Sequence, residues 1–329
     1  MFESKSRVLS ESAAAALLFL CGPFVSSTVQ GQSLPDGVTE IGPVSIPDSQ
    51  RYTFESRNVD QTYLIDVVRI ASPAAPQSDG PLPVVFVTDG NSMSYLTAGV
   101  AILNSIESLP PMYIVAIGFS FDPGLSPREM LLEFSLRRGR DYSPTGAFDA
   151  AARRRLEAAW HQYRSQMGLA DAPYPSWAIP DGADNFLAFI NDELKPFIAR
   201  HYPDANVNDS ALYGHSGGGW FVLNVLFTKP ESFARYIAVS PGGPDGLLLP
   251  IAAKSDFETT KASLFLAFAE GDSSKIVGDS TALNSFFRAN AHAGFEYTFQ
   301  FFPGELHNSG VAGAFIRGLR AVFQRSRQP

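Results

Sequence analysis

The sequence predicts an α/β fold in which a mostly parallel sheet is covered by helices on both faces. Short runs without charged residues, such as 84–87 and 113–117, alternate with segments of helical periodicity. Strands that are buried on both faces of a parallel sheet are apolar along their whole length. The chain of 329 residues is 45% hydrophobic and contains 26 Phe, which is enough to fill the core of one large domain.

The expected elements follow in order from residue 51 and form one domain over residues 51–326. Residues 51–55 and 61–70 are rich in β-branched and aromatic side chains, which predicts two strands. Apolar runs predict the other strands, and periodic segments predict the helices. The further strands are expected at 84–87, 113–117, 211–213, 236–239, 264–269 and 297–302, and the main helices at 94–107, 189–201, 220–227 and 313–324.

Residues 124–183 interrupt this alternation. They contain a run of arginines at 137–140, a helix-like segment at 148–167 and a loop rich in Pro and Trp. Because the segment follows a strand, it lies at the edge of the sheet where open α/β folds bind ligands. We interpret it as a cap or active-site rim; a plain surface insertion is the alternative.

The N-terminus has the pattern of a secretory signal peptide. Lys5 and Arg7 precede an apolar run over residues 13–25 that is too short to span a bilayer comfortably. We therefore expect a signal peptide over 1–31, export to the periplasm or the exterior, and a linker over 32–50. Cys21 is the only cysteine and lies in the signal peptide, so the mature chain would have no disulfide.

The overall charge disfavours several classes of partner. A net charge of −8 and a pI near 5.2 are not typical of a nucleic-acid-binding surface. No segment after residue 31 is long and apolar enough for stable insertion into a membrane, and nothing indicates a particular oligomeric state. The sequence has neither the ligand spacing of a metal site nor a glycine-rich nucleotide loop, so we expect no metal and no cofactor.

Residues 214–218 read Gly-His-Ser-Gly-Gly and match the G-x-S-x-G pattern between a short strand and a helix. In the α/β-hydrolase fold this turn lifts a nucleophilic serine clear of the sheet, and larger flanking residues would clash. We therefore predict Ser216 as a nucleophile. The amide of Gly217 would begin the helix and stabilise an oxyanion, whereas His215 is expected to pack within the turn. A glycine-rich helix entry without chemistry is the alternative.

A nucleophilic serine needs a base, and the hydrolase order is serine, acid, histidine. His307 follows the last predicted strand and precedes the final helix, where this fold delivers its imidazole, so we prefer it to His292. The acid should follow the strand at 264–269. Asp272 is the first choice, Asp279 and Glu270 are the alternatives, and a dyad without an acid stays open.

The second oxyanion donor is expected after the strand at 84–87. Gly90 permits a turn there, and the backbone amide of Asn91 would face the site; an ordinary turn is the alternative. Asp89 is expected to hold that turn or to be a buried hydrogen-bonding residue, and not to carry a proton. Several cationic and aromatic residues are candidates for binding an anionic or aromatic acyl group, although the arginines could equally be a solvated charge run. These candidates are Arg137, Arg138, Arg140, Tyr142, Trp177 and Trp220.

Five segments together resemble the α/β-hydrolase family of enterochelin-esterase-like and esterase-D-like proteins over roughly residues 50–325. The segments are 89–91 (DGN), 140–144 (RDYSP), 186–202, 213–220 (YGHSGGGW) and 233–241 (FARYIAVSP). In this family a larger residue commonly follows the serine, and Gly217 departs from that pattern. The departure bears on substrate choice and leaves the nucleophile assignment intact.

The resemblance implies hydrolysis of a carboxylic ester without a cofactor. Relatives in this family act on catecholate siderophore esters, on feruloyl or acetyl esters, or transfer mycolyl groups. The expected partner is thus a small-molecule ester, cleaved through an acyl-enzyme by Ser216, His307 and Asp272. Transfer to a sugar or lipid alcohol, peptidase activity and a catalytically silent binding protein are the alternatives.

Overall fold

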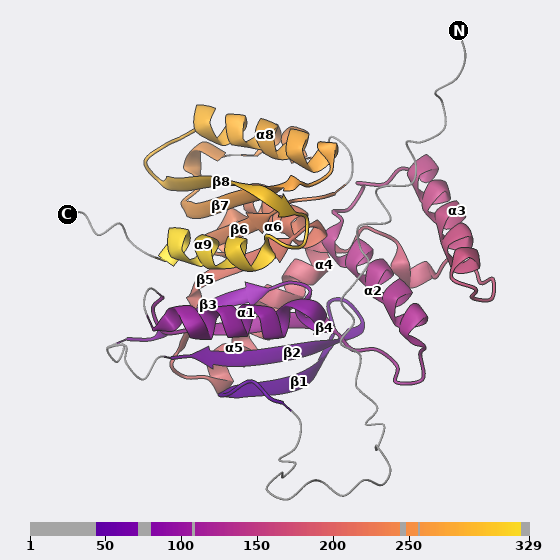
Figure 1. Ribbon diagram of the computed structural model, residues 1–329, viewed down its shortest axis with the longest axis horizontal. Helices are drawn as coiled ribbons and strands as arrows, with labels where there is room; N and C mark the ends of the chain where they lie inside the picture. Colours follow the sequence, from indigo (N-terminus) through magenta and orange to yellow (C-terminus); the bar gives the residue numbers. More distant parts are fainter. Residues whose placement is uncertain (1–43, 72–79, 107–108, 244–247, 256, 324–329) are drawn as a thin grey trace, which may run out of the picture.

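The computed structural model describes residues 44–71, 80–106, 109–243, 248–255 and 257–323 (Figure 1). The expected signal peptide at 1–31, and residues 32–43 of the expected linker, lie outside these ranges. Within them, one sheet of eight strands has the order β1-β2-β4-β3-β5-β6-β7-β8. The strands are β1 (Ser49–Ser56), β2 (Gln61–Ile70), β3 (Leu82–Val87), β4 (Met112–Phe119), β5 (Ala205–His215), β6 (Arg235–Val239), β7 (Ala262–Gly271) and β8 (Phe295–Leu306).

The direction of the strands confirms a mostly parallel sheet. Strand β2 pairs antiparallel with β1 and β4, whereas every pairing in the series β4-β3-β5-β6-β7-β8 is parallel. The carboxyl ends of the parallel strands therefore meet at one edge of the sheet. The order, with its reversal between β3 and β4, is that of the α/β-hydrolase fold.

Helices cover both faces of the sheet, as the apolar strand runs predicted. In β3, Val84 and Phe86 contribute to one core cluster, and Val85 and Val87 contribute to the other. Figure 1 shows α1 and α9 lying on one face, with α5 and α6 behind the sheet. The helices are α1 (Gly90–Ser105), α2 (Pro127–Tyr142), α3 (Ala150–Gln166), α4 (Ala183–Ala188), α5 (Lys195–His201), α6 (Gly217–Thr228), α7 (Leu248–Lys254), α8 (Ser274–Ala289) and α9 (Val311–Phe323).

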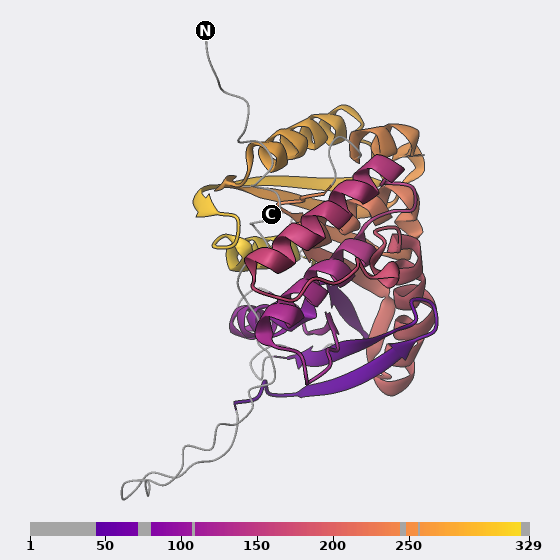
Figure 2. The ribbon, with the colours of Figure 1, turned by 90° about the vertical axis from the view of Figure 1, so that its right-hand side faces the viewer.

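The expected insertion contains two helices that lie side by side at one end of the domain (Figures 1 and 2). The sequence predicted α3 but not α2, which carries the arginine run. Helix α2 begins with a capping box, in which Ser126 accepts from the Glu129 amide and the Glu129 carboxylate accepts from the Ser126 amide, and Pro127 follows at the first position. This signal was present in the sequence, because Ser-x-x-Glu with Pro after the cap is typical of a helix start.

Other boundaries differ for local reasons. Strand β1 begins at Ser49, inside the expected linker. Strand β8 runs on to Leu306, beyond the expected end at residue 302, and Gly304 has a positive φ of 74° in this extension. Helix α8 ends at Ala289, so His292 lies beyond it. The expected helix at 189–201 begins with a π-helical segment, Phe189–Leu194.

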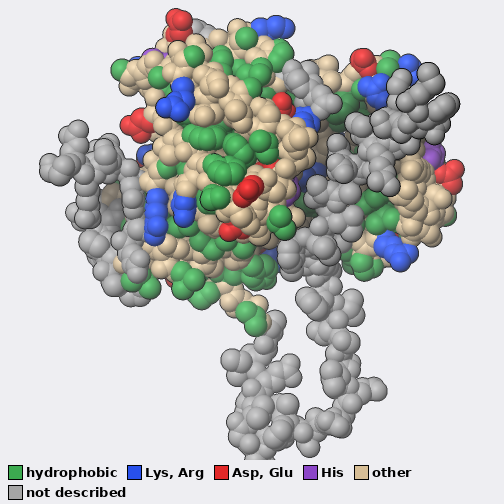
Figure 3. Space-filling model, turned by 45° about the horizontal axis from the view of Figure 1, so that its top comes forward, with side chains coloured by type: hydrophobic (Ala, Val, Ile, Leu, Met, Phe, Trp, Pro, Cys, Tyr) green, Lys and Arg blue, Asp and Glu red, His purple; other side chains and the backbone are tan. Residues whose placement is uncertain are grey.

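Acidic and basic side chains are interspersed on the face of the molecule that Figure 3 shows, and no basic stripe appears there. Of the helices in the described ranges, none has the length and apolar character that crossing a membrane requires.

Candidate active site

Three strands that lie next to one another end in residues with left-handed backbone. Asp89 follows β3 with φ 59°, Ser216 follows β5 with φ 57°, and Ser240 follows β6 with φ 44°. This conformation costs a residue with a Cβ on the order of 1 kcal/mol or more, so it persists only where the surroundings impose it. Because β3, β5 and β6 are parallel and adjacent, the three residues lie at one edge of the sheet. Such clustering marks this edge as the candidate site.

The turn at Ser216 is tight on both sides. A Cβ on Gly214 would lie 2.2 Å from the carbonyl of Gly218, and a Cβ on Gly218 would lie 2.3 Å from Thr88 Oγ1. Neither position accepts a side chain, as the G-x-S-x-G pattern predicted. Ser216 occupies the N-cap of α6, and its amide donates to the Val239 carbonyl at 2.9 Å. The serine is therefore fixed between β5, β6 and the start of α6.

His307 and Asp272 are brought together next to His215, the residue before Ser216. The Nδ1 of His307 is hydrogen-bonded to Oδ1 of Asp272. The other carboxylate oxygen of Asp272 accepts from the Ser240 hydroxyl at 2.7 Å and from the Ala269 amide at 2.8 Å. Burial raises the pKa of Asp272, but the bonds from His307, Ser240 and Ala269 outweigh burial and leave the pKa below its usual value. Asp272 is thus held as a carboxylate that can orient the imidazole and support its charge.

The alternatives to these two residues have other partners. Asp279 pairs with Lys275 at 2.6 Å on the surface of α8, and Glu270 accepts from the Gly304 amide at 2.6 Å. The ring of His292 bonds to the carbonyl of Phe257 at 3.0 Å. Ser240 was missed in the sequence, where it is only the residue that follows an apolar strand.

His215 lies against the candidate base. Its Nε2 is 2.8 Å from the main-chain oxygen of His307, and the two rings have centroids 4.6 Å apart. Burial, followed by the charge of His307, lowers the pKa of His215 to about 3. The expected packing role is therefore accompanied by a hydrogen bond that the sequence did not predict.

Two backbone amides lie at helix starts on this edge. Gly217 is the first residue of α6, and Asn91 is the second residue of α1. Helical bonding in α1 begins with the amides of Ser92 and Met93, which donate to Asp89, so the Asn91 amide precedes it. The Asn91 side chain fixes this turn by donating to the Phe119 carbonyl at 2.9 Å and accepting from the Phe119 amide at 2.7 Å. That role for the side chain was not predicted.

Arg138 connects the insertion to the turn at Ser216. Its Nε donates to Asp89 at 2.7 Å, and its Nη2 donates to the carbonyl of His215 at 3.2 Å. The hydroxyl of Tyr142 donates to the same carboxylate at 3.0 Å. Burial lowers the pKa of Arg138, but the Asp89 carboxylate outweighs this and keeps the pKa above its usual value. The Asp89 carboxylate makes no hydrogen bond that caps α1 and is instead a buried acceptor for Arg138 and Tyr142 from α2.

The remaining candidates for substrate binding differ in how far their side chains are exposed to solvent. Arg140 is buried, where it pairs with Asp141 at 2.6 Å and also contacts Gln61. Trp220 is buried beneath the backbone of Gly243. Trp177 is 41% exposed, and the guanidinium groups of Arg137 and Arg140 lie 5.5 and 5.7 Å from its ring centre. Of this set, Trp177 has the most accessible side chain.

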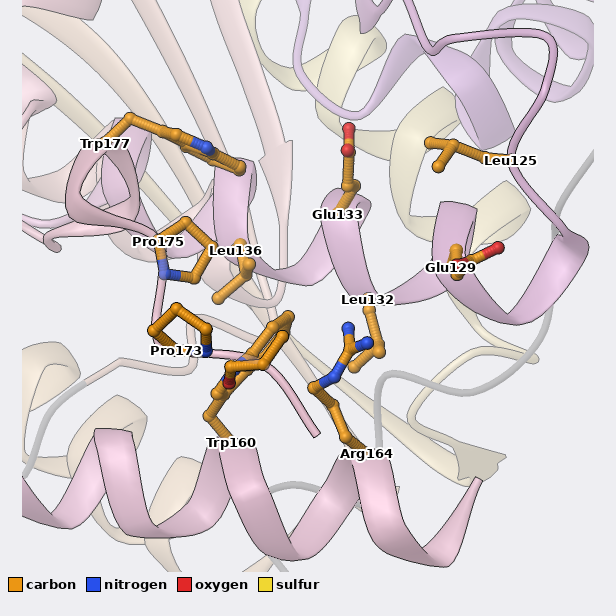
Figure 4. A pocket seen from close by; sticks show the side chains of 11 residues that line it. Leu125, Glu129, Leu132, Glu133, Leu136, Trp160, Arg164, Pro173, Pro175 and Trp177 are labelled. Carbon is orange, nitrogen blue, oxygen red and sulfur yellow. The ribbon is translucent and has the colours of Figure 1, made fainter. Parts of the chain in front are cut away.

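A cavity of about 210 Å³ lies within the insertion (Figure 4). Trp160 from α3 forms one wall, Leu132 and Leu136 from α2 form another, and the Pro173–Trp177 segment closes a third side. The charged groups at its rim already have partners, because Glu133 pairs with Arg137 at 2.8 Å and Arg164 donates to the Ala170 carbonyl at 2.7 Å. The cavity is therefore mainly apolar.

No group of three or more His, Cys, Asp or Glu side chains suited to a metal ion occurs among the residues that the structure describes.

The fold and the strand-to-helix turn with its histidine and aspartate define a protein of the α/β-hydrolase class. Residues 154–300 match a protein family described as "Putative esterase". The chain is 32% identical to the ferri-bacillibactin esterase BesA of Bacillus subtilis over an alignment of 203 residues. This alignment covers 60% of this chain and 59% of the relative. It is 31% identical to a siderophore triacetylfusarinine C esterase of Aspergillus fumigatus over an alignment of 226 residues. This second alignment covers 67% of this chain and 65% of the relative.

The chain thus spans about three fifths of the length of these curated relatives. Among solved structures, the BES protein from Bacillus cereus superimposes with a TM-score of 0.66 at 22% identity, covering 88% of this chain and 99% of that one. Its likeness supports the fold. The chain is thus similar in sequence to siderophore esterases and has the α/β-hydrolase fold.

Proposed function

We propose that this protein is a serine hydrolase of carboxylic esters. The observation that carries the proposal is the bond between His307 and Asp272, with His307 also bonded to His215, the residue before Ser216 in its strained turn. A carboxylate that accepts from Nδ1 fixes the tautomer in which Nε2 is free to take a proton. A serine on a left-handed turn at a helix start is the arrangement that exposes a nucleophile.

In the proposed reaction, His307 takes the proton of Ser216 while the serine oxygen attacks the ester carbonyl. The amides of Gly217 and Asn91 donate to the oxyanion, and Asp272 stabilises the imidazolium. His307 then gives its proton to the departing alcohol, which leaves an acyl-enzyme on Ser216. Water, deprotonated by His307, attacks this ester; His307 then returns the proton to the departing Ser216 oxygen, and the acid is released.

The substrate class follows from the relatives. Both curated relatives named above are siderophore esterases, and the family match points to ester hydrolysis. We therefore propose a siderophore ester as the substrate. Trp177 in the insertion is exposed, so its ring is available for stacking on an aromatic group of the substrate. Arg138 is instead paired with Asp89 and is not proposed to contact the substrate.

We also propose that the chain is exported. Lys5 and Arg7 ahead of a short apolar run support a signal peptide. N-terminal sequencing of the protein recovered from the periplasm or medium tests this, and an uncleaved chain in the cytoplasm would contradict it.

The catalytic proposal is tested with Ser216→Ala on a p-nitrophenyl ester and with a fluorophosphonate probe. We expect turnover to fall by about 10⁴-fold or more and labelling to be lost, while the melting temperature stays close to that of the wild type. Ser263→Ala is a matched control, because Ser263 is in β7 and its exposed hydroxyl bonds Glu296. Labelling of another residue, or activity retained by Ser216→Ala, would refute the proposal.

The substrate is tested by comparing ferri-bacillibactin, triacetylfusarinine C and enterobactin with p-nitrophenyl acetate. We expect at least one siderophore to be hydrolysed with a kcat/KM about tenfold above that of the simple ester, because binding energy from its larger body is used at the reacting carbonyl. Equal kcat/KM values for all four esters would contradict a siderophore substrate and leave the esterase proposal standing.

A further inference from the structure

His215 makes a hydrogen bond whose direction is fixed. The partner of its Nε2 is the main-chain oxygen of His307 at 2.8 Å, and a carbonyl oxygen only accepts. Nε2 of His215 therefore carries a proton and donates. The main chain of His215 is held in turn, because its own carbonyl accepts from Arg138 at 3.2 Å. His215 thus connects Arg138 of α2, through its main-chain carbonyl, to the backbone of His307, through its ring.

The surroundings of His215 keep its ring neutral. Its ring lies against His307, and the charged groups that act on it are Arg138, from α2, and Asp272, at the end of β7. Burial and the positive charges of His307 and Arg138 disfavour protonation, and they outweigh Asp272 and the bond to His307. A neutral neighbour adds no charge beside His307 when His307 takes up a proton.

His307 is consequently held from two sides. Asp272 fixes its ring through Nδ1, and His215 fixes its backbone through the carbonyl oxygen. The residue follows directly after β8 and is the first residue of a turn, so its backbone lies outside the regular strand. We propose that His215 is a positioning residue that keeps the base His307 aligned by donating a hydrogen bond to its main-chain oxygen. This inference rests on the proposed function for its kinetic consequence only.

Two substitutions separate the hydrogen bond from the packing of the ring. His215→Gln keeps a donor at a similar reach and loses the ring, whereas His215→Phe keeps a ring beside His307 and loses the donor. We expect the Phe variant to lose about tenfold or more in kcat with KM within about twofold, and the Gln variant to stay within about threefold of the wild type in kcat. Circular dichroism and the melting temperature establish that both variants are folded.

A second readout needs no substrate. The proton between His307 Nδ1 and Asp272 should give a low-field NMR signal, which we expect to persist in the Gln variant and to broaden or disappear in the Phe variant. If the Phe variant keeps both kcat and this signal while the Gln variant loses them, His215 acts by packing and the inference is overturned.

The two proposals fail in distinguishable ways. A wild-type protein that hydrolyses no ester and is not labelled at Ser216 refutes the proposed function, yet its low-field signal and that of the variants still test His215. Conversely, an active wild type with an equally active Phe variant refutes the inference and leaves the esterase proposal standing.

Discussion

The guanidinium of Arg138 occupies the space beside Gly217: its Nη2 lies 3.3 Å from the position that a Cβ on residue 217 would take. Arg138 is not free to move aside, because it is bonded to Asp89 and to the carbonyl of His215. The glycine that sets this sequence apart from the family's common pattern is therefore matched by an arginine from the insertion. Residues 138 and 217 should be considered as a pair.

Gly217→Ala is expected to lower kcat/KM by about tenfold, because Arg138 is held in place and the new methyl group must instead displace the backbone amide at residue 217. In an Arg138→Ala background the same substitution should change kcat/KM by less than about twofold, since the crowding is gone. The double-mutant cycle is measured with an aryl ester. An equal loss in both backgrounds would show that the two residues are independent.

Asp272→Asn should reduce kcat by about 10³- to 10⁴-fold, because an amide in place of the carboxylate favours the wrong tautomer of His307 and removes the charge that stabilises its imidazolium. Asp279→Asn and Glu270→Gln serve as controls and should stay within about twofold, since these carboxylates bond Lys275 and the Gly304 amide instead. Steady-state kinetics of the three variants at one pH make the comparison. A large loss in Asp279→Asn, with Asp272→Asn active, would reassign the acid.

Arg140→Met is expected to lower the free energy of unfolding by about 3 kcal/mol, because it leaves the Asp141 carboxylate buried without its cation. The side chain of Asp141 is fully buried, and its other oxygen accepts from the hydroxyl of Tyr63 at 2.7 Å. Arg69→Met is the control: Arg69 pairs with Asp204, and both side chains are more than two-fifths exposed, so its loss should cost less than about 1 kcal/mol. Urea unfolding of both variants measures the difference, and equal values would contradict a structural role for Arg140.

His215 should make the protein less stable in acid. Its pKa is lowered to about 3 in the folded protein, whereas an unfolded histidine titrates near 6.5. Between these values the unfolded chain binds a proton that the folded protein does not, so the free energy of unfolding falls as the pH falls. The contribution is at most about 1.4 kcal/mol per pH unit and is absent above the unfolded pKa.

The matched variant for this effect is His215→Gln, which keeps a donor and has no titratable ring. Its free energy of unfolding, measured by urea unfolding between pH 4 and 6, should depend on pH less steeply than that of the wild type by nearly one proton. Identical slopes would show that the ring of His215 is accessible to protons in the folded protein.

The fold and the order of the candidate site could be predicted because both depend on local patterns. Strands without polar residues reveal a sheet covered on both faces, and Gly214 and Gly218 are required by contacts within a few residues of Ser216. Asp272 could be preferred to Asp279 because it directly follows a strand, whereas Asp279 lies one turn into α8. These inferences need no knowledge of how distant segments meet.

The arginine run could not be resolved in the same way. Arg138 and Arg140 are two residues apart, so they project to roughly opposite sides of α2 and meet different partners. The partners are Asp89 and Gln61, which are 49 and 79 residues away in the sequence. Only the packing of α2 against the domain decides which arginine is near the turn at Ser216, and the same holds for the bond from His215 to His307.

Helix α2 separates two kinds of surface along its length. Phe134, Arg138 and Tyr142 face the strand ends, whereas Leu132 and Leu136 line the cavity of the insertion. Protein engineering could therefore redesign the cavity side together with Trp160 and the Pro173–Trp177 segment without exchanging any residue that holds Asp89 or His215. We expect a library confined to this cavity side to retain turnover, because its residues make none of the hydrogen bonds to Asp89 or His215.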